Sequence, residues 1–386
     1  MLDLDAQTIF LTLAGSQAHG TARAGSDVDL RGVCIAPLAL RVSYRNHFEQ
    51  YEGVLSGPLW EAVVPRLRAH PSASRGLDEK VETVIFDVAK FVKLCAAANP
   101  NALEVLFADE SDWMHHTEHW AKLYAQRALF LSRKVQQTYL GYAMAQLKRI
   151  RTHRSWLLNP PKARPARSEF QLPDRPTISH DDRNRIEQAV AEKLRSWDLD
   201  SLEMPRATRI ALAQRLQEFW CDTLGSSDDD MDGRLRTVAA ESLELSDAMI
   251  ATLGAERRYR AAVKHWESYE RWKDERNPDR AALETRFGYD TKHAMHLIRL
   301  MRTGLETLRS GDLQVRRPDA DELAAIRDGA LSYEALLESA EALSAEMADA
   351  TAHCTLPDDV DHDAIERLLV ALIEDFGASK PLGADR

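Results

Sequence analysis

The sequence has few cysteines, no long apolar run and no excess of positive charge. Its four cysteines among 386 residues lie far apart and form no CxxC pair, which argues against a zinc site and suits a reducing compartment. No run reaches the ~18 apolar residues of a membrane span. The first residues, MLDLDAQTIF, lack the basic segment and apolar core of a signal peptide. We therefore expect a cytoplasmic protein.

The charge balance is acidic. The formal net charge is −11, so the whole molecule should not be attracted to nucleic acid or to anionic lipid. Any polyanionic partner must therefore bind a local basic patch.

The pattern of apolar residues differs between two consecutive regions of the chain. Apolar, β-prone runs at residues 8–14, 28–35 and 81–86 predict strands, and Asp87 is placed to cap a helix that follows the last of them. Beyond residue 120 the apolar spacing is helical. The predicted helical segments are residues 119–152, 181–198, 205–224, 233–272, 279–310, 320–330 and 333–350. We predict an α+β protein with a small α/β domain over residues 1–115 and a large helical domain over residues 116–386.

Two segments interrupt the helical region. Residues 159–176 (NPPKARPARSEFQLPDRP) are rich in proline and cannot form a regular helix. Residues 228–232 (DDDMD) form an acidic loop that we expect to be solvated, because calcium-loop spacing is absent.

The stretch GSQAHGTARAGSDVDLRG, residues 15–32, carries the clearest chemical signal. Asp27 and Asp29 should face the same side of a strand, and two carboxylates this close repel each other unless a cation lies between them. Mg²⁺ is the usual cation, and it takes further oxygen ligands from a substrate phosphate. Glycine lets the backbone approach a ligand closely, so Gly15 and Ser16 are candidates for holding phosphate oxygens.

These residues resemble a known family. Gly15-Ser16, Gly20, Ser26-Asp27, Asp29 and Arg31-Gly32 are similar to the signature of the DNA polymerase β-like nucleotidyltransferase superfamily. The closer similarity is to predicted bacterial nucleotidyltransferases that include an RNA-ligase-associated group. It continues through NPNALEVLF, which contains Glu104, through HRSWLLNPP and through KHAMHLIRL.

The resemblance implies a catalytic centre with Mg²⁺, or alternatively Mn²⁺, and a nucleoside triphosphate (NTP) as substrate. Asp27 and Asp29 would bind two metal ions that hold the attacking and leaving oxygens. A third carboxylate on a neighbouring strand would complete the metal site. Glu82 and Asp87 are both candidates, and we prefer Glu82 because Asp87 already has a structural role as a helix cap.

Other polar residues are candidates for contacting the nucleotide. His19 and Ser26 flank the glycine-rich turn, and Arg31 would either pair with a nearby acid or approach the nucleotide. Lys292, His296 and Arg299 follow i, i+4, i+7 spacing, so they share one helix face and could line a cleft for the triphosphate. An ordinary solvated helix face is the alternative.

A basic arm lies between residues 148 and 176. Residues 148–175 contain eight lysines and arginines against two acidic residues, with Trp156 and Phe170 among them. Basic groups interleaved with aromatic rings suit an RNA contact, for which Lys162, Arg164 and Arg167 are the candidates. The alternative is a solvated arm packed on the helical domain.

The sequence therefore predicts transfer of a nucleoside monophosphate from an NTP to an acceptor hydroxyl, with release of pyrophosphate. An RNA end is the preferred acceptor. The alternatives are a protein or small-molecule acceptor, and a non-catalytic module that binds nucleotide or RNA.

Overall fold

The computed structural model describes residues 2–75, 81–174, 247–276 and 278–378. The chain forms two compact units: residues 1–158 together with 278–386, and residues 159–277. Several sequence predictions lie outside the described residues: the helices over 181–198 and 205–224, the acidic loop 228–232, Cys221 and Arg175.

A mixed five-stranded sheet forms the centre of the first unit, in the order β3-β4-β2-β1-β5. The strands are β1 (Thr8–Leu13), β2 (Val28–Cys34), β3 (Gln50–Gly53), β4 (Val81–Asp87) and β5 (Trp113–His116). β2 and β4 are parallel, and the other neighbouring strands are antiparallel. The three predicted strands are confirmed as β1, β2 and β4, whereas the short strands β3 and β5 were not predicted.

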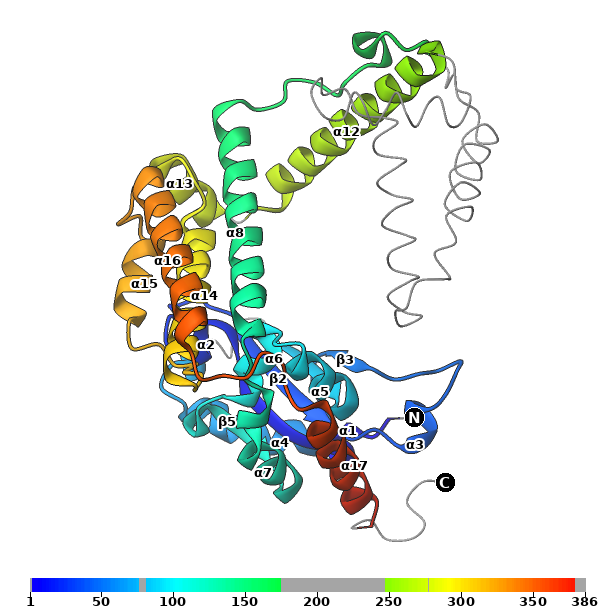
Figure 1. Ribbon diagram of the computed structural model, residues 1–386, viewed down its shortest axis with the longest axis vertical. Helices are drawn as coiled ribbons and strands as arrows, with labels where there is room; N and C mark the ends of the chain where they lie inside the picture. The colour runs from blue at the N-terminus through cyan, green and yellow to red at the C-terminus, as the bar shows by residue number, and fades with distance from the viewer. Residues whose placement is uncertain (1, 76–80, 175–246, 277, 379–386) are drawn as a thin grey trace. The chain divides into compact units, whose positions relative to one another are not determined.

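Helices cover both faces of this sheet (Figure 1). Because side chains alternate along a strand, Leu11, Leu30 and Ile85 pack on one side with apolar residues of α4 (Gly57–Ala69). Phe10 and Val33 point to the other side. There the Phe10 ring stacks on Trp120 of α7 (Glu118–Ala125), with ring centroids 3.6 Å apart. The sheet is therefore buried on both faces.

The remaining helices of the first unit lie before, between and after the strands. Those up to residue 158 are α1 (Leu4–Gln7), α2 (Gly15–His19), α3 (Leu38–Arg41), η1 (Ala73–Arg75), α5 (Val88–Ala96), α6 (Pro100–Leu106), η2 (Glu110–Asp112), η3 (Arg127–Phe130) and α8 (Lys134–Leu158). Those after residue 277 are α13 (Pro278–Phe287), α14 (Thr291–Ser310), α15 (Ala320–Arg327), α16 (Tyr333–His353) and α17 (His362–Ala378).

One hydrophobic core joins the sheet to the helices that come much later in the sequence. α14 packs against α8, α15 and α16, and α17 packs against α5 and α7 (Figure 1). Apolar residues of β1, α5, α8, α14 and α16 belong to the same buried cluster. The α+β fold class is confirmed, and this packing brings α14 to the same part of the unit as the first two strands.

The second unit is described over residues 159–174 and 247–276. Residues 159–174 contain only one short 3₁₀ helix, η4 (Arg167–Phe170), so the predicted helix interruption is confirmed as far as residue 174. The long helix α12 (Asp247–Glu275) follows. Among all described helices, none is long and apolar enough to cross a membrane.

Candidate active site

The glycine–serine turn lies directly against a carboxylate of β2. Gly15 begins α2 with φ +59°, a conformation that favours glycine. A Cβ atom built on Gly15 would lie 2.6 Å from Asp29 Oδ2, so no other residue fits without displacing that side chain. The N–H of Ala14 donates to the Asp29 carbonyl oxygen at 2.9 Å, which holds the turn to β2.

Asp29 stands opposite Glu82 in the parallel pairing of β2 and β4. Asp27 is exposed and immediately precedes β2. Burial raises the pKa of Asp29, the positive charge of Arg31 lowers it, and the nearby Glu82 and Asp27 carboxylates raise it further. Arg31 Nη2 lies 3.3 Å from Asp29 Oδ1, so the predicted acid partner of Arg31 is Asp29. The carboxylates of Asp27, Asp29 and Glu82 are thus close enough for their charges to interact.

Asp87 lies at the other end of β4, paired with Cys34. It is five positions after Glu82, which corresponds to about 16 Å along a strand. Its Oδ2 accepts from Ala89 N at 3.0 Å and its Oδ1 accepts from Ala36 N at 3.2 Å, and burial raises its pKa. Asp87 caps α5, and the structure does not bring it to Asp27 and Asp29.

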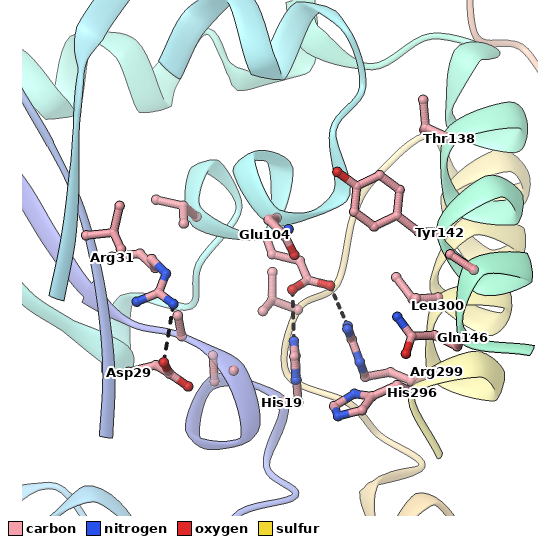
Figure 2. A pocket seen from close by; sticks show the side chains of 18 of the residues that line it. His19, Asp29, Arg31, Glu104, Thr138, Tyr142, Gln146, His296, Arg299 and Leu300 are labelled. Carbon is pink, nitrogen blue, oxygen red and sulfur yellow. Dashed lines mark hydrogen bonds and ion pairs between the residues drawn. The ribbon is translucent and has the colours of Figure 1, made fainter. Parts of the chain in front are cut away.

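The predicted basic face of α14 is opposed by an acid on α6. Arg299 Nη1 donates to Glu104 Oε1, and His19 Nε2 lies 3.0 Å from Glu104 Oε2 (Figure 2). Burial opposes the charge of Glu104, but Arg299 and His19 hold its pKa below the ordinary value. Burial, followed by the Arg299 charge, lowers the pKa of His19. The buried acid therefore connects α2 to α14 through two side chains.

A cavity of ≈ 1070 Å³ in the first unit joins these elements. The predicted site residues that line it are Gly15, His19, Asp29, Arg31, Lys292, His296 and Arg299. The remaining predicted site residues do not line the cavity: Ser16, Ser26, Asp27, Glu82 and Asp87. Ser26 accepts a hydrogen bond from Arg23 N at 2.9 Å and so stabilises the turn before β2. Burial, followed by nearby positive charge, lowers the pKa of His296 to about 2.

Several lining residues were not predicted. Tyr142 and Gln146 of α8 form the wall that faces Glu104 and Arg299 (Figure 2), and Asn99 Nδ2 donates to the Tyr142 hydroxyl at 2.8 Å. The sequence analysis predicted no individual role for Glu104. A lone acid within the apolar run ALEVLF nevertheless indicates a buried carboxylate that needs a partner. The residues on α8 gave no sequence signal of their own.

The basic arm is divided by the structure. Lys148, Arg149 and Arg154 lie on α8 in the first unit, whereas Lys162, Arg164 and Arg167 belong to the second. Lys162 and Arg164 are exposed.

Arg164 and Arg167 both contact α12. Arg164 Nη2 lies 3.3 Å from Glu267 Oε1, and the guanidinium lies 5.9 Å from the Trp266 ring centroid. Arg167 is largely buried, forms an ion pair with Glu256 and stacks over Tyr259 at 5.2 Å. Arg167 therefore attaches the arm to α12.

The comparison with protein families agrees with the family that the sequence resembles. Residues 3–158 match the RNA repair pathway DNA polymerase beta family. The comparison with curated proteins gave no match. Among solved structures, a nucleotidyltransferase-like protein from Exiguobacterium sibiricum 255-15 is 12% identical, with 70% of this chain and 76% of that chain covered and a TM-score of 0.20. The resemblance to polymerase β-like nucleotidyltransferases is confirmed for residues 3–158.

Proposed function

We propose that this chain, whose residues 3–158 are of the polymerase β type, transfers a nucleoside monophosphate from an NTP to a hydroxyl at an RNA end. The acceptor oxygen forms a bond to the α-phosphorus, the bond between that phosphorus and the α,β-bridging oxygen breaks, and pyrophosphate leaves. The description of the matching family, which names RNA repair, supports the choice of RNA.

The observation that carries this proposal is the convergence of carboxylates beside a glycine that has no room for a side chain. Asp29 is flanked by Gly15 and stands opposite Glu82. Asp27 and Glu82 both raise the pKa of Asp29, although burial has the largest effect. Such an oxygen-rich, mutually repelling set fits a hard divalent cation.

Asp27, Asp29 and Glu82 would hold Mg²⁺, or alternatively Mn²⁺. The bound ion would neutralise charge on the triphosphate and on the pyrophosphate that leaves. Glu82 is our candidate for accepting the proton of the acceptor hydroxyl, because it stands opposite Asp29 and is exposed. Asp87, which accepts two backbone N–H groups, keeps only its structural role in this scheme.

The cationic side of the cavity would receive the triphosphate. Lys292 supplies a positive charge on α14, and His296 is neutral at physiological pH because its pKa is lowered to about 2, so it can donate a hydrogen bond without a charge. Arg299 is only 7% exposed and bonded to Glu104, so it acts chiefly by holding α14 and His19 in position. Gly15, Ser16 and Arg31 remain candidates for contacting phosphate.

Lys162 and Arg164 remain our candidates for contacting an RNA backbone, since both are exposed. The ion pair of Arg167 with Glu256 favours a structural role for that arginine. A small molecule or a protein side chain is the second candidate acceptor. We place the reaction in the cytoplasm, because Cys34, Cys95 and Cys354 are free thiols, which suits a reducing compartment.

The test is a labelling assay with the full chain. Each α-³²P NTP is incubated with Mg²⁺ or Mn²⁺ and with RNA oligonucleotides whose ends carry a hydroxyl or a phosphate, and separate reactions contain small acceptors or no acceptor. We expect label on an RNA that has a free terminal hydroxyl. Label on the protein or on a small molecule alone would replace RNA as the acceptor. No labelling under any of these conditions would contradict the enzymatic proposal.

A further inference from the structure

Two histidines and an aspartate meet where α8 passes the beginning of α14. His153 comes from α8, Asp290 is the N-cap of α14, and His293 lies in the first turn of that helix. One ligand atom from each residue lies within 4.8 Å of the other two. The Asp290 side chain is fully buried, and both histidine side chains are mostly buried. None of the three has a role in the proposed transfer reaction.

Neighbouring contacts hold the three side chains in place. Asp290 Oδ1 accepts the backbone N–H of His293 at 3.0 Å, which fixes the carboxylate and directs Oδ2 towards both imidazoles. The His153 ring stacks on Trp156 with centroids 5.6 Å apart. Arg154 Nη1 donates to the Gly288 carbonyl at 2.8 Å, which fastens the turn before α14 to α8.

The spacing of the atoms suits ligands of one metal ion. Asp290 Oδ2 lies 3.6 Å from His153 Nδ1 and 3.6 Å from His293 Nε2. These separations exceed the ~3.2 Å limit of a normal N–H···O hydrogen bond. Bonds of about 2.0–2.1 Å to tetrahedral zinc place two nitrogen or oxygen ligands roughly 3.4 Å apart. The observed separations are close to that value.

We propose that His153, Asp290 and His293 form a binding site for a divalent transition metal, with Zn²⁺ as the preferred ion. Two imidazoles and one carboxylate are donors that zinc takes, and three protein ligands leave a fourth position for solvent or a substrate group. The sequence prediction against zinc rested on the spacing of cysteines, and this set uses none.

The site would link α8 to the beginning of α14. The same helix carries Lys292 and His296, which line the large cavity together with His293. A bound metal would therefore restrain the cationic wall of that cavity. The proposal does not depend on the transfer reaction, because its donors differ from Asp27, Asp29 and Glu82.

The test measures metal binding by the full chain directly. The protein is stripped with a chelator, titrated with Zn²⁺ at neutral pH, and separately loaded with Co²⁺ to record the visible absorption of nitrogen- and oxygen-bound cobalt. We expect tight binding that is weakened at least about 100-fold in His153→Gln and in His293→Gln, since even the loss of a residue that only supports a ligand costs 10–100-fold. His353→Gln removes an exposed histidine elsewhere and should change nothing.

The Asp290→Asn variant tests metal ligation separately from folding. Asparagine can still cap α14, so the helix should persist by circular dichroism while zinc affinity and the cobalt spectrum are lost. Asp29→Asn should keep both, because it alters only the carboxylates of the other site. Unchanged Zn²⁺ affinity in all three ligand variants, or loss of zinc binding in Asp29→Asn alone, would overturn the proposal and leave an ion-pair cluster.

Discussion

Charged side chains are arranged differently in the cavity of the first unit and in the part of the basic arm that lies in the second unit. In the cavity, Lys292 and Asp29 come from elements far apart in the sequence and line one space. In the arm, Arg167 is bonded to Glu256 on α12, within its own unit. Charged residues from distant parts of the sequence thus line one cavity in the first unit, whereas Arg167 pairs with an acid inside the second unit.

The difference follows from what each charge contacts. Arg167 and Glu256 neutralise each other, and their side chains are 14% and 11% exposed. Asp29 also has an arginine nearby, yet its pKa stays raised by burial and by neighbouring acids. Charges that are not compensated within a fold are better candidates for ligand binding than charges that are merely numerous.

The largest expected effect is the loss of transfer activity in Asp29→Asn. Removing a metal ligand at the reacting centre should lower the rate by about 10³-fold, which corresponds to several kcal/mol of lost transition-state stabilisation. Because burial raises the pKa of Asp29 in the folded state, its ionised carboxylate opposes folding above the ordinary pKa. The free energy of unfolding of Asp29→Asn at neutral pH should therefore equal or exceed that of the unaltered protein. Labelling rates and urea melts measure both quantities.

Asp109→Asn is the matched control for that variant. Asp109 caps a short 3₁₀ helix near the surface, and asparagine can keep the cap. Its labelling rate should match that of the unaltered protein. Near-normal turnover in Asp29→Asn with Mg²⁺ would contradict the assigned role of the carboxylates.

The next largest effect is the loss of stability in Glu104→Gln. Removing the charge leaves buried Arg299 without its ionic partner, and breaking a buried pair costs about 3 kcal/mol or more. The pKa of Glu104 is lowered in the folded state, so its stabilisation is present above the ordinary value of 4.5 and is lost as pH falls through the folded pKa. The difference in unfolding free energy between Glu104→Gln and the unaltered protein, measured by urea melts, should therefore become smaller in acid.

A smaller effect distinguishes the two ends of β4. Asp87→Ala removes a helix cap and one further acceptor, which should cost about 1–2 kcal/mol while leaving activity within about twofold. Glu82→Gln should do the reverse, with activity lost and stability retained. Thermal melts paired with labelling rates measure both. A stable but inactive Asp87→Ala protein would make Asp87 the third carboxylate.

Local sequence signals predicted β1, β2 and β4 but not the strands and helices that pack beside them. β1 is a continuous apolar and β-branched run, whereas β2 and β4 have charged residues between their apolar and β-branched ones. Asp87 was identified as a cap from its position alone. β3 is short and partly exposed, so neither its length nor its pattern distinguishes it from a loop. The wall of α8 around Tyr142 and the bond between Glu104 and Arg299 depend on long-range packing, which one sequence does not encode locally.

The smallest effect tests the basic arm. If Lys162 and Arg164 contact RNA phosphates, changing both to alanine should flatten the slope of log affinity against log salt by about 1.4, since each contact to a single strand contributes about 0.7. Arg167→Ala is the matched comparison: it breaks the ion pair with Glu256, so it should loosen the arm from α12 in a proteolysis assay and leave the slope nearly unchanged. Filter binding over a range of salt concentrations measures the slope. An unchanged slope in the double variant would mean that the arm is a packed surface, and would favour a small acceptor for the cavity.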